Sequence, residues 1–95
     1  METQAEPRDE ELQAHILYTL ARRGKWGASH TSLIYVRAGL PPSRRRKAEK
    51  LAKGLANKGL LTWLMKTGEI HISLNPRARK EITQLVEAYL GKVFW

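Results

Sequence analysis

The sequence predicts a mainly α domain with a small β-hairpin, a fold of the α+β class. Apolar residues recur at helical spacing in several segments, two runs of alternating apolar residues flank a glycine-bearing turn, and Gly, Pro or Asn stands at the predicted boundaries. A chain of 95 residues has room for one modest hydrophobic core. We therefore expect a disordered tail over residues 1–8 and one domain over residues 9–95.

The first helix is expected to begin at Asp9, as its cap, and to run to about Arg23 before Gly24 ends it. Three of its apolar residues share one face, and Leu17 lies beside them: Leu12, Ile16 and Leu20. This spacing predicts that one side of the helix packs against the core.

A second, shorter helix is predicted after a linker over residues 24–28, with Ser29 as its N-cap and Leu33 and Ile34 as apolar residues. Gly39 suits the position after the end of this helix. The following "GLPPS" predicts a tight turn, because neither proline can lie inside a helix, and Ser43 can cap the next helix.

The third helix is predicted over residues 44–58, before Gly59. Small and apolar residues cluster on one side of it: Ala48, Leu51, Ala52 and Leu55. A basic and polar stripe lies on the opposite side: Arg46, Lys50, Lys53 and Asn57. The run 44–47, "RRRK", would occupy the first turn, where the helix dipole disfavours cations by about 0.3–1 kcal/mol per charge. A bound polyanion would relieve this unfavourable placement.

The stretch "LLTWLMKTGEIHISL" predicts a β-hairpin, because apolar residues alternate on both sides of "KTG". Asn75 and Pro76 form a strong start signal for a last helix over residues 76–90. Its apolar face is wide: Ala78, Ile82, Leu85, Val86, Tyr89 and Leu90. An apolar tail over residues 91–95 follows it.

The charge of the chain is strongly positive and unevenly distributed. The formal net charge is +8, yet residues 1–11 hold five of the nine acids. Residues 22–66 hold twelve basic residues and a single acid, Glu49. Such a segment is typical of a protein that binds a polyanion such as nucleic acid, although a basic surface kept for solubility would have the same composition.

Other classes of function find little support in the sequence. The chain has no Cys, and its histidines, His15, His30 and His71, fall in separate predicted elements, so we expect no disulfide, metal or cofactor. We see no catalytic pairing of residues and expect no enzyme. No apolar run approaches the roughly 20 residues of a membrane span, and the acidic N-terminus does not suit a signal peptide. We expect a soluble, cytoplasmic, nucleoid-associated protein without a membrane partner.

Two stretches resemble a known family. "VRAGLPPSRRRKAEKLAKGLANKGLL" resembles the helix-turn-helix of winged-helix transcription regulators, whose recognition helix typically ends in a similar "GLL". "ISLNPRARKEI" is similar to the junction between wing and helix in MarR and PadR-type regulators, with Ala78 where that family usually has Gly. The matching positions are Leu74, Asn75, Pro76 and Arg79. The resemblance, over about residues 10–90, implies a winged helix-turn-helix with the third helix in the major groove of double-stranded DNA.

This resemblance assigns DNA contacts to the third helix, its flanks and the hairpin tip. Arg45 and Arg46 are candidate base contacts, because arginine can donate two hydrogen bonds to guanine. For Lys66 and Thr67 a plain surface turn is an open alternative. The full set of candidate DNA-binding residues is Ser43, Arg44, Arg45, Arg46, Lys47, Lys50, Lys53, Asn57, Arg37, Lys66 and Thr67.

The same resemblance implies a homodimer, because the terminal helices of MarR and PadR-type proteins pair two subunits. The expected interface residues are Leu17, Ile82, Leu85, Val86, Tyr89, Val93, Phe94 and Trp95. An apolar chain end that a small core cannot cover would favour such an interface. The alternative is that the tail folds back onto the core of its own chain.

The expected function is that of a dimeric, sequence-specific transcription regulator. An architectural or plasmid-partition protein with the same fold, which coats DNA with low sequence preference, is one alternative. A winged helix that binds another protein is a second, and the basic stripe argues against it.

Overall fold

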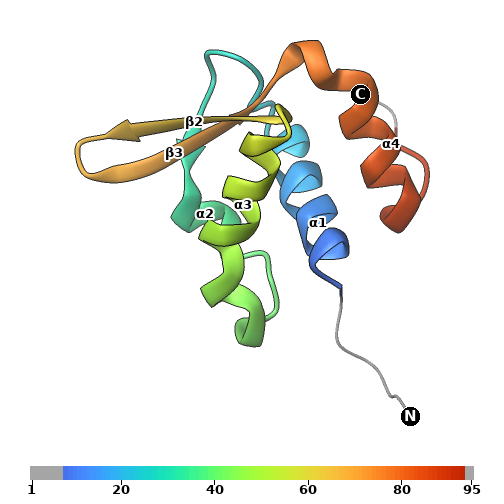
Figure 1. Cartoon of the computed structure of the whole chain (residues 1–95), viewed down its shortest axis with the longest axis horizontal. Helices are drawn as coiled ribbons and strands as arrows, with labels where there is room; N and C mark the ends of the chain where they lie inside the picture. The colour runs from blue at the N-terminus through green and yellow to red at the C-terminus, as the bar shows by residue number, and fades with distance from the viewer. Residues whose placement is uncertain (1–7, 94–95) are drawn as a thin grey trace.

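The computed structural model describes residues 8–93, which form four α-helices, two 3-10 helices (η) and a three-stranded antiparallel sheet. The α+β class is confirmed, and the arrangement is consistent with a winged-helix-like domain (Figure 1). Residues 1–7 of the expected tail, together with Phe94 and Trp95, lie outside the described residues. In chain order the elements are α1 (Asp9–Arg22), β1 (Thr31–Ser32), α2 (Leu33–Arg37), η1 (Pro42–Lys47), α3 (Ala48–Asn57), β2 (Leu61–Lys66), β3 (Glu69–Leu74), η2 (Pro76–Ala78) and α4 (Arg79–Leu90).

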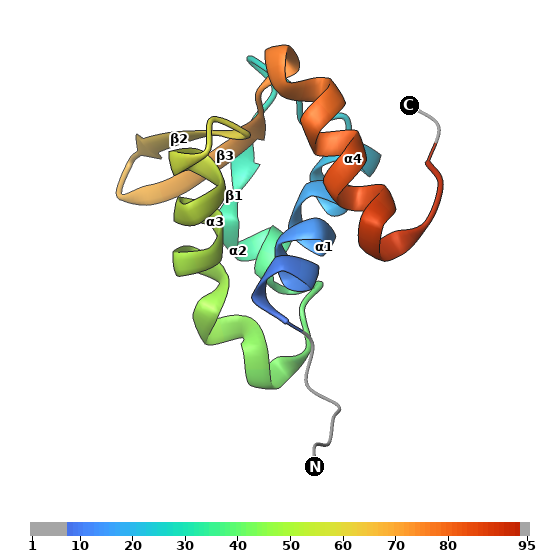
Figure 2. The ribbon, with the colours of Figure 1, turned by 45° about the vertical axis from the view of Figure 1, so that its right-hand side comes forward.

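Helix α1 is the centre of the fold. It packs against α4 on one side and against α3 and α2 on the other (Figures 1 and 2). The β2–β3 hairpin projects away from the helices on the side opposite α4. The hairpin and the exposed side of α3 are therefore separated from α4 by the body of the domain.

The predicted apolar faces of the helices form the core. Leu12, Ile16 and Leu20 of α1 are buried, as expected from their spacing. The four residues predicted on the inner side of the third helix are buried as well: Ala48, Leu51, Ala52 and Leu55. Burial of such side chains stabilises a fold by roughly 1.5–3 kcal/mol for each large aliphatic residue.

Strand β3 is the central strand of the sheet, between β1 and β2. The predicted hairpin is confirmed: β2 pairs antiparallel with β3 from Leu61 opposite Leu74 to Lys66 opposite Glu69. β1 was not predicted, and it pairs with the other edge of β3 through Thr31 opposite Ile72. Beyond β1, the main chain of the loop after α1 bonds to the end of β3, since the Leu74 N–H donates to the Lys25 carbonyl over 2.7 Å.

The start of α2 differs from the prediction because the sheet takes the preceding residues. Thr31 and Ser32 are extended and pair with β3, so α2 begins only at Leu33. Ser32, and not Ser29, is its N-cap, with the side-chain oxygen accepting a hydrogen bond from the Ile34 N–H over 3.3 Å. Asp9 is likewise the first residue inside α1 and not its cap, because the N-cap position belongs to Arg8.

The predicted third helix is divided into two elements. Residues Pro42–Lys47 form η1, and the α-helix proper begins at Ala48. Ser43 lies inside η1 and caps neither element, because Pro41 and Lys47 occupy their N-cap positions and neither cap has a side-chain hydrogen bond. A proline at the first helical position suits a helical turn, which accounts for η1 starting at Pro42.

The start signal of the last helix is confirmed, with η2 as its first turn. Asn75 is the N-cap, and its Oδ1 accepts a hydrogen bond from the Arg77 N–H over 3.0 Å. The Asn75 side chain also donates from Nδ2 to the main-chain oxygen of Gly59 over 2.8 Å. This one residue therefore links the turn after α3 to the start of α4.

Candidate nucleic-acid interface

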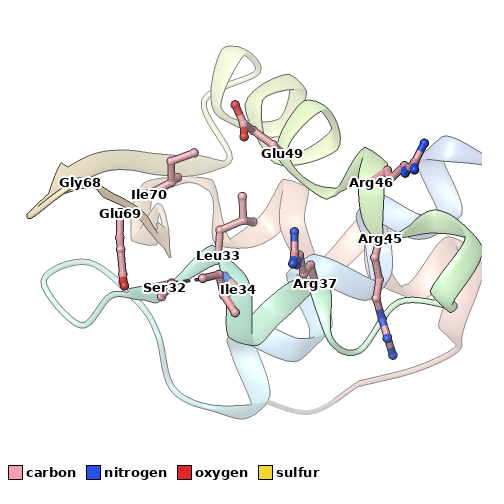
Figure 3. A pocket seen from close by; sticks show the side chains of 10 residues that line it. All are labelled: Ser32, Leu33, Ile34, Arg37, Arg45, Arg46, Glu49, Gly68, Glu69 and Ile70. Carbon is pink, nitrogen blue, oxygen red and sulfur yellow. Dashed lines mark hydrogen bonds between the residues drawn. The ribbon is translucent and has the colours of Figure 1, made fainter.

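A groove of about 260 Å³ lies between α2, the junction of η1 with α3, and the tip of the hairpin (Figure 3). Three segments that are separate in the sequence meet there: α2 and the hairpin bring both apolar and charged residues, and the junction of η1 with α3 brings charged residues alone. The lining residues are Ser32, Leu33, Ile34, Arg37, Arg45, Arg46, Glu49, Gly68, Glu69 and Ile70. Among the predicted contacts, Arg37, Arg45 and Arg46 are thus brought to one place.

The basic stripe of the third helix is exposed over its whole length. Arg46, Lys50, Lys53 and Asn57 all lie on the solvent side, opposite the buried face of α3. Within residues 8–93, the structure gives Arg46, Lys50 and Lys53 no ion pair and no side-chain hydrogen bond. Their charges are therefore available to an external anion.

Arg45, unlike Arg46, is hydrogen-bonded to main-chain oxygens of its own chain. Its guanidinium donates from Nε to the Leu40 carbonyl and from Nη2 to the Ala38 carbonyl, each over 3.2 Å. Figure 3 shows the Arg45 and Arg46 side chains leaving the same turn in opposite directions. Arg45 thus satisfies carbonyls at the C-terminal end of α2, where a cation is also favoured by the helix dipole. These bonds give Arg45 a structural role in the free chain, and its assignment as a base contact stays a prediction.

Lys47 is also paired inside the chain. Its Nζ lies 3.0 Å from Oδ1 of Asp9, in the first turn of α1. The basic run as a whole precedes α3, so the first turn of the α-helix holds Glu49, the sign of charge that the dipole favours. Ser43 is exposed and Arg44 is half-buried. Within the run, Lys47 at the N-cap of α3 is thus offset by the Asp9 carboxylate.

The hairpin tip carries two predicted contacts, Lys66 and Thr67, and both are exposed. Thr67 and Gly68 form the two-residue turn and both have positive φ, 49° and 81°. This backbone is ordinary for glycine and unfavourable for a β-branched residue. Further along β2, Trp63 is half-buried and packs against the hydrophobic core.

Exposed apolar residues lie on α2 and β2, a surface feature that the sequence pattern did not predict. Ile34 and Tyr35 of α2 are 55% and 62% exposed, and Met65 of β2 is 60% exposed. Met65 stands opposite Ile70 in the hairpin, so both side chains lie on the same face of the sheet as the groove. Their alternation in the sequence predicted the hairpin, and the tip of this hairpin extends beyond the helices (Figure 1).

Two histidines that were expected to lie apart are neighbours. The Nδ1 atoms of His30 and His71 are 2.8 Å apart, and Nε2 of His71 is 3.5 Å from a carboxylate oxygen of Glu69. Burial, followed by the proximity of His71, Lys66 and Lys25, lowers the pKa of His30 below its ordinary value of 6.5. The described part of the chain holds no cluster of three or more residues able to ligate a metal ion.

No protein-family model, curated protein or solved structure matches this chain. The groove, the exposed stripe and the hairpin are the features of the chain that bear on its function. None of the helices within residues 8–93 combines the length and the hydropathy that a membrane crossing requires.

Most of the predicted dimer residues that the structure describes are buried in the core or hydrogen-bonded within a single chain. Leu17, Ile82 and Val86 are completely buried in the core of a single chain, so their assignment to a subunit interface is corrected. The Tyr89 hydroxyl donates a hydrogen bond to the Glu10 carboxylate, which joins α4 to α1. The Val93 N–H donates to the Glu87 carboxylate over 3.1 Å, so this part of the tail folds back. Leu85 is half-buried, and Phe94 and Trp95 lie outside the described residues.

Proposed function

We propose that this chain is a winged helix-turn-helix protein that binds double-stranded DNA, and that it acts as a transcription regulator and not as an enzyme. In this proposal η1 and α3 enter the major groove, and the β2–β3 hairpin is the wing that lies against the neighbouring backbone. The cytoplasm, at the nucleoid, is the corresponding location.

The order of the elements supports the fold assignment. One helix and a short strand precede α2, a tight turn joins α2 to η1 and α3, and a hairpin follows α3 directly. The first short strand pairs with the returning strand of the hairpin, which gives the sheet order β1-β3-β2. A hairpin held in this way lies beside the recognition helix that we propose.

The single observation that carries the functional proposal is the set of exposed cations without a partner among the described residues. Arg46, Lys50 and Lys53 lie along one exposed side of η1 and α3, and Arg46 also lines the groove. Duplex DNA offers closely spaced phosphates, and each phosphate neutralised by a cation releases counterions. A protein surface of this composition gains binding free energy from that release.

A binding titration with matched variants tests the proposal. We expect a fluorescently labelled duplex to bind the wild-type chain at low salt and to bind the double variant Lys50→Ala, Lys53→Ala much more weakly. The control is Lys80→Ala, Lys92→Ala, which removes the same charge from exposed residues on and after α4, away from α3. Equal losses in both double variants would mean that only net charge matters and would contradict the proposed face.

An architectural, DNA-coating function is the second candidate, and one observation favours it. With Arg45 bonded to the end of α2, Arg46 is the one arginine in the exposed stripe, and the cations that follow it are lysines. Lysine acts as a point charge toward phosphate and gives less base discrimination than arginine. Footprinting separates the two functions: a short, discrete footprint supports the regulator, and an extended one supports coating.

The regulator that we propose acts as a homodimer on a two-fold site. The feature that supports this is the part of α4 that stays half-exposed, including Leu85 and Leu90. Sedimentation equilibrium at tens of micromolar tests it: a mass near twice 10.9 kDa supports the dimer. A monomer would remove the dimer from the proposal and leave the DNA-binding face as it stands.

A further inference from the structure

Glu49 is the single acid in a segment that holds twelve basic residues. It is exposed on the first turn of α3 and lines the groove, between the hairpin and the side of the helix that carries Arg46 (Figure 3). Arg46 lies three residues before it and Lys53 four residues after it, the spacings at which helix side chains can pair. Within residues 8–93, the structure nevertheless gives Glu49 no ion pair.

An unpaired carboxylate on a DNA-binding face repels phosphates and lowers affinity for every sequence. A carboxylate is only an acceptor of hydrogen bonds, so in the major groove it can bond the amino groups of cytosine and adenine. Guanine N7 and O6 and thymine O4 are acceptors and would repel it. Adenine presents its N7 acceptor beside the amino group, whereas cytosine presents the amino group alone.

We infer that Glu49 is a specificity-determining residue that accepts a hydrogen bond from the N4 amino group of a cytosine in the major groove. This inference rests on the proposed DNA-binding function. Arg46 and Glu49 are three residues apart, a rise of roughly 5 Å along a helical segment, and base pairs are spaced by about 3.4 Å. The cytosine therefore lies one or two base-pair steps from the base pair that Arg46 contacts.

The two possible roles of Glu49 predict different results when its charge is removed. If Glu49 acts only through its charge, Glu49→Ala tightens binding to all duplexes by the same factor. In the role that we assign, Glu49→Ala also abolishes the preference at one position, a loss of roughly tenfold in discrimination. Glu49→Gln keeps the shape and gains a donor, and glutamine bonds adenine through N6 and N7. This variant is therefore expected to prefer adenine at the same position.

Selection of bound sequences from a random duplex library, with the wild type and the two variants, tests the assignment. Glu81→Gln is the matched control, because Glu81 is an exposed acid in the first turn of α4. We expect cytosine for the wild type and for Glu81→Gln, adenine for Glu49→Gln, and no preference for Glu49→Ala. The same base preference in all four proteins, with duplex binding intact, would overturn the role of Glu49 and leave the DNA-binding function standing. Failure of every protein to bind duplex DNA would overturn the proposed function and this inference with it.

Discussion

The guanidinium of Arg45 donates a hydrogen bond from Nε to the main-chain oxygen of Leu40 over 3.2 Å. A second bond, from Nη2 to the Ala38 oxygen, has the same length. Together they fix the turn between α2 and η1, and so the angle at which α3 follows α2. Arg46, the next residue, makes no such bond to a described residue and faces solvent. Adjacent residues of one basic run therefore have different surroundings.

The first prediction is that Arg45 contributes more than Arg46 to the free energy of unfolding. Arg45→Ala is expected to lower the free energy of unfolding by about 1–2 kcal/mol, because two exposed or half-buried hydrogen bonds of about 0.5–1.5 kcal/mol each are lost. Arg46→Ala should change it by no more than about 0.5 kcal/mol. Urea unfolding followed by circular dichroism measures both, and equal stability of the two variants would show that the Arg45 bonds contribute nothing in solution.

The second prediction concerns the kind of DNA contact that each exposed cation makes. Arg46→Ala should weaken binding of the preferred sequence by roughly 1–3 kcal/mol and relax the base preference at one position. Lys53 lies about two helical turns after Arg46. Lys53→Ala should weaken binding of all sequences about equally, as expected for a phosphate contact. Competition titrations with single-base variants of the selected site provide the measurement. If both variants weaken all sequences equally, Arg46 is a phosphate contact.

The sequence was sufficient for features that depend on one segment at a time. The inner face of α3, from Ala48 to Leu55, followed from a period of 3.6 residues, and the Asn75 cap followed from local turn chemistry. The short strand at Thr31 and Ser32 did not, because its pairing partner lies some forty positions away and two residues carry no periodicity of their own.

Contacts between segments that are distant in the sequence also distinguish the residues of the candidate site. Arg45, Arg46 and Lys47 are equivalent in sequence and differ only in which backbone or acid from another element lies near them. Leu17 and Ile82 were assigned to a subunit interface on the resemblance to MarR and PadR-type regulators, yet both are completely buried in the core of a single chain, where α1 packs against α4. The sequence shows Glu49 as the one acid among the basic residues 22–66, but only the fold shows that it lines the groove.

The third prediction concerns the strained hairpin turn. Thr67 has a φ of 49°, and its neighbour Gly68 has a φ of 81°. Thr67→Asn should raise the free energy of unfolding by about 0.5–1 kcal/mol, because Asn-Gly suits a turn in which both residues have positive φ. In a domain of this size that corresponds to a rise in Tm of roughly 2–8 °C.

The control for this turn is Thr62→Asn, on the exposed side of β2, where asparagine is disfavoured and no gain is expected. A fall in Tm for Thr67→Asn would mean that the hydrogen bond from the Thr67 hydroxyl to the Lys66 carbonyl, 2.7 Å long, outweighs the backbone strain.

The fourth prediction concerns the histidine pair. Because the pKa of His30 in the folded chain lies below 6.5, the unfolded chain binds more protons at mildly acidic pH. The free energy of unfolding should therefore be highest above pH 6.5 and should fall as the pH decreases from there toward 5. Protonation places a charge beside His71, Lys66 and Lys25, with Glu69 on the far side of His71 as the nearest opposing charge.

Urea unfolding between pH 8 and pH 5 measures this dependence. His30→Gln should flatten the profile, while His15→Gln, in α1, should leave it as in the wild type. An unchanged slope in His30→Gln would assign the acid sensitivity to other groups.

The central claim is that the exposed cations of η1 and α3 bind duplex DNA, with the lysines of α3 on phosphates, and a salt titration of wild-type affinity tests it most directly. With Lys50 and Lys53 each neutralising a phosphate, the logarithm of the association constant should fall against the logarithm of the salt concentration with a slope of about −1.8 or steeper. Lys53→Ala should reduce the magnitude of that slope by about 0.9. A slope near zero, or no binding of duplex DNA even at low salt, would contradict the account.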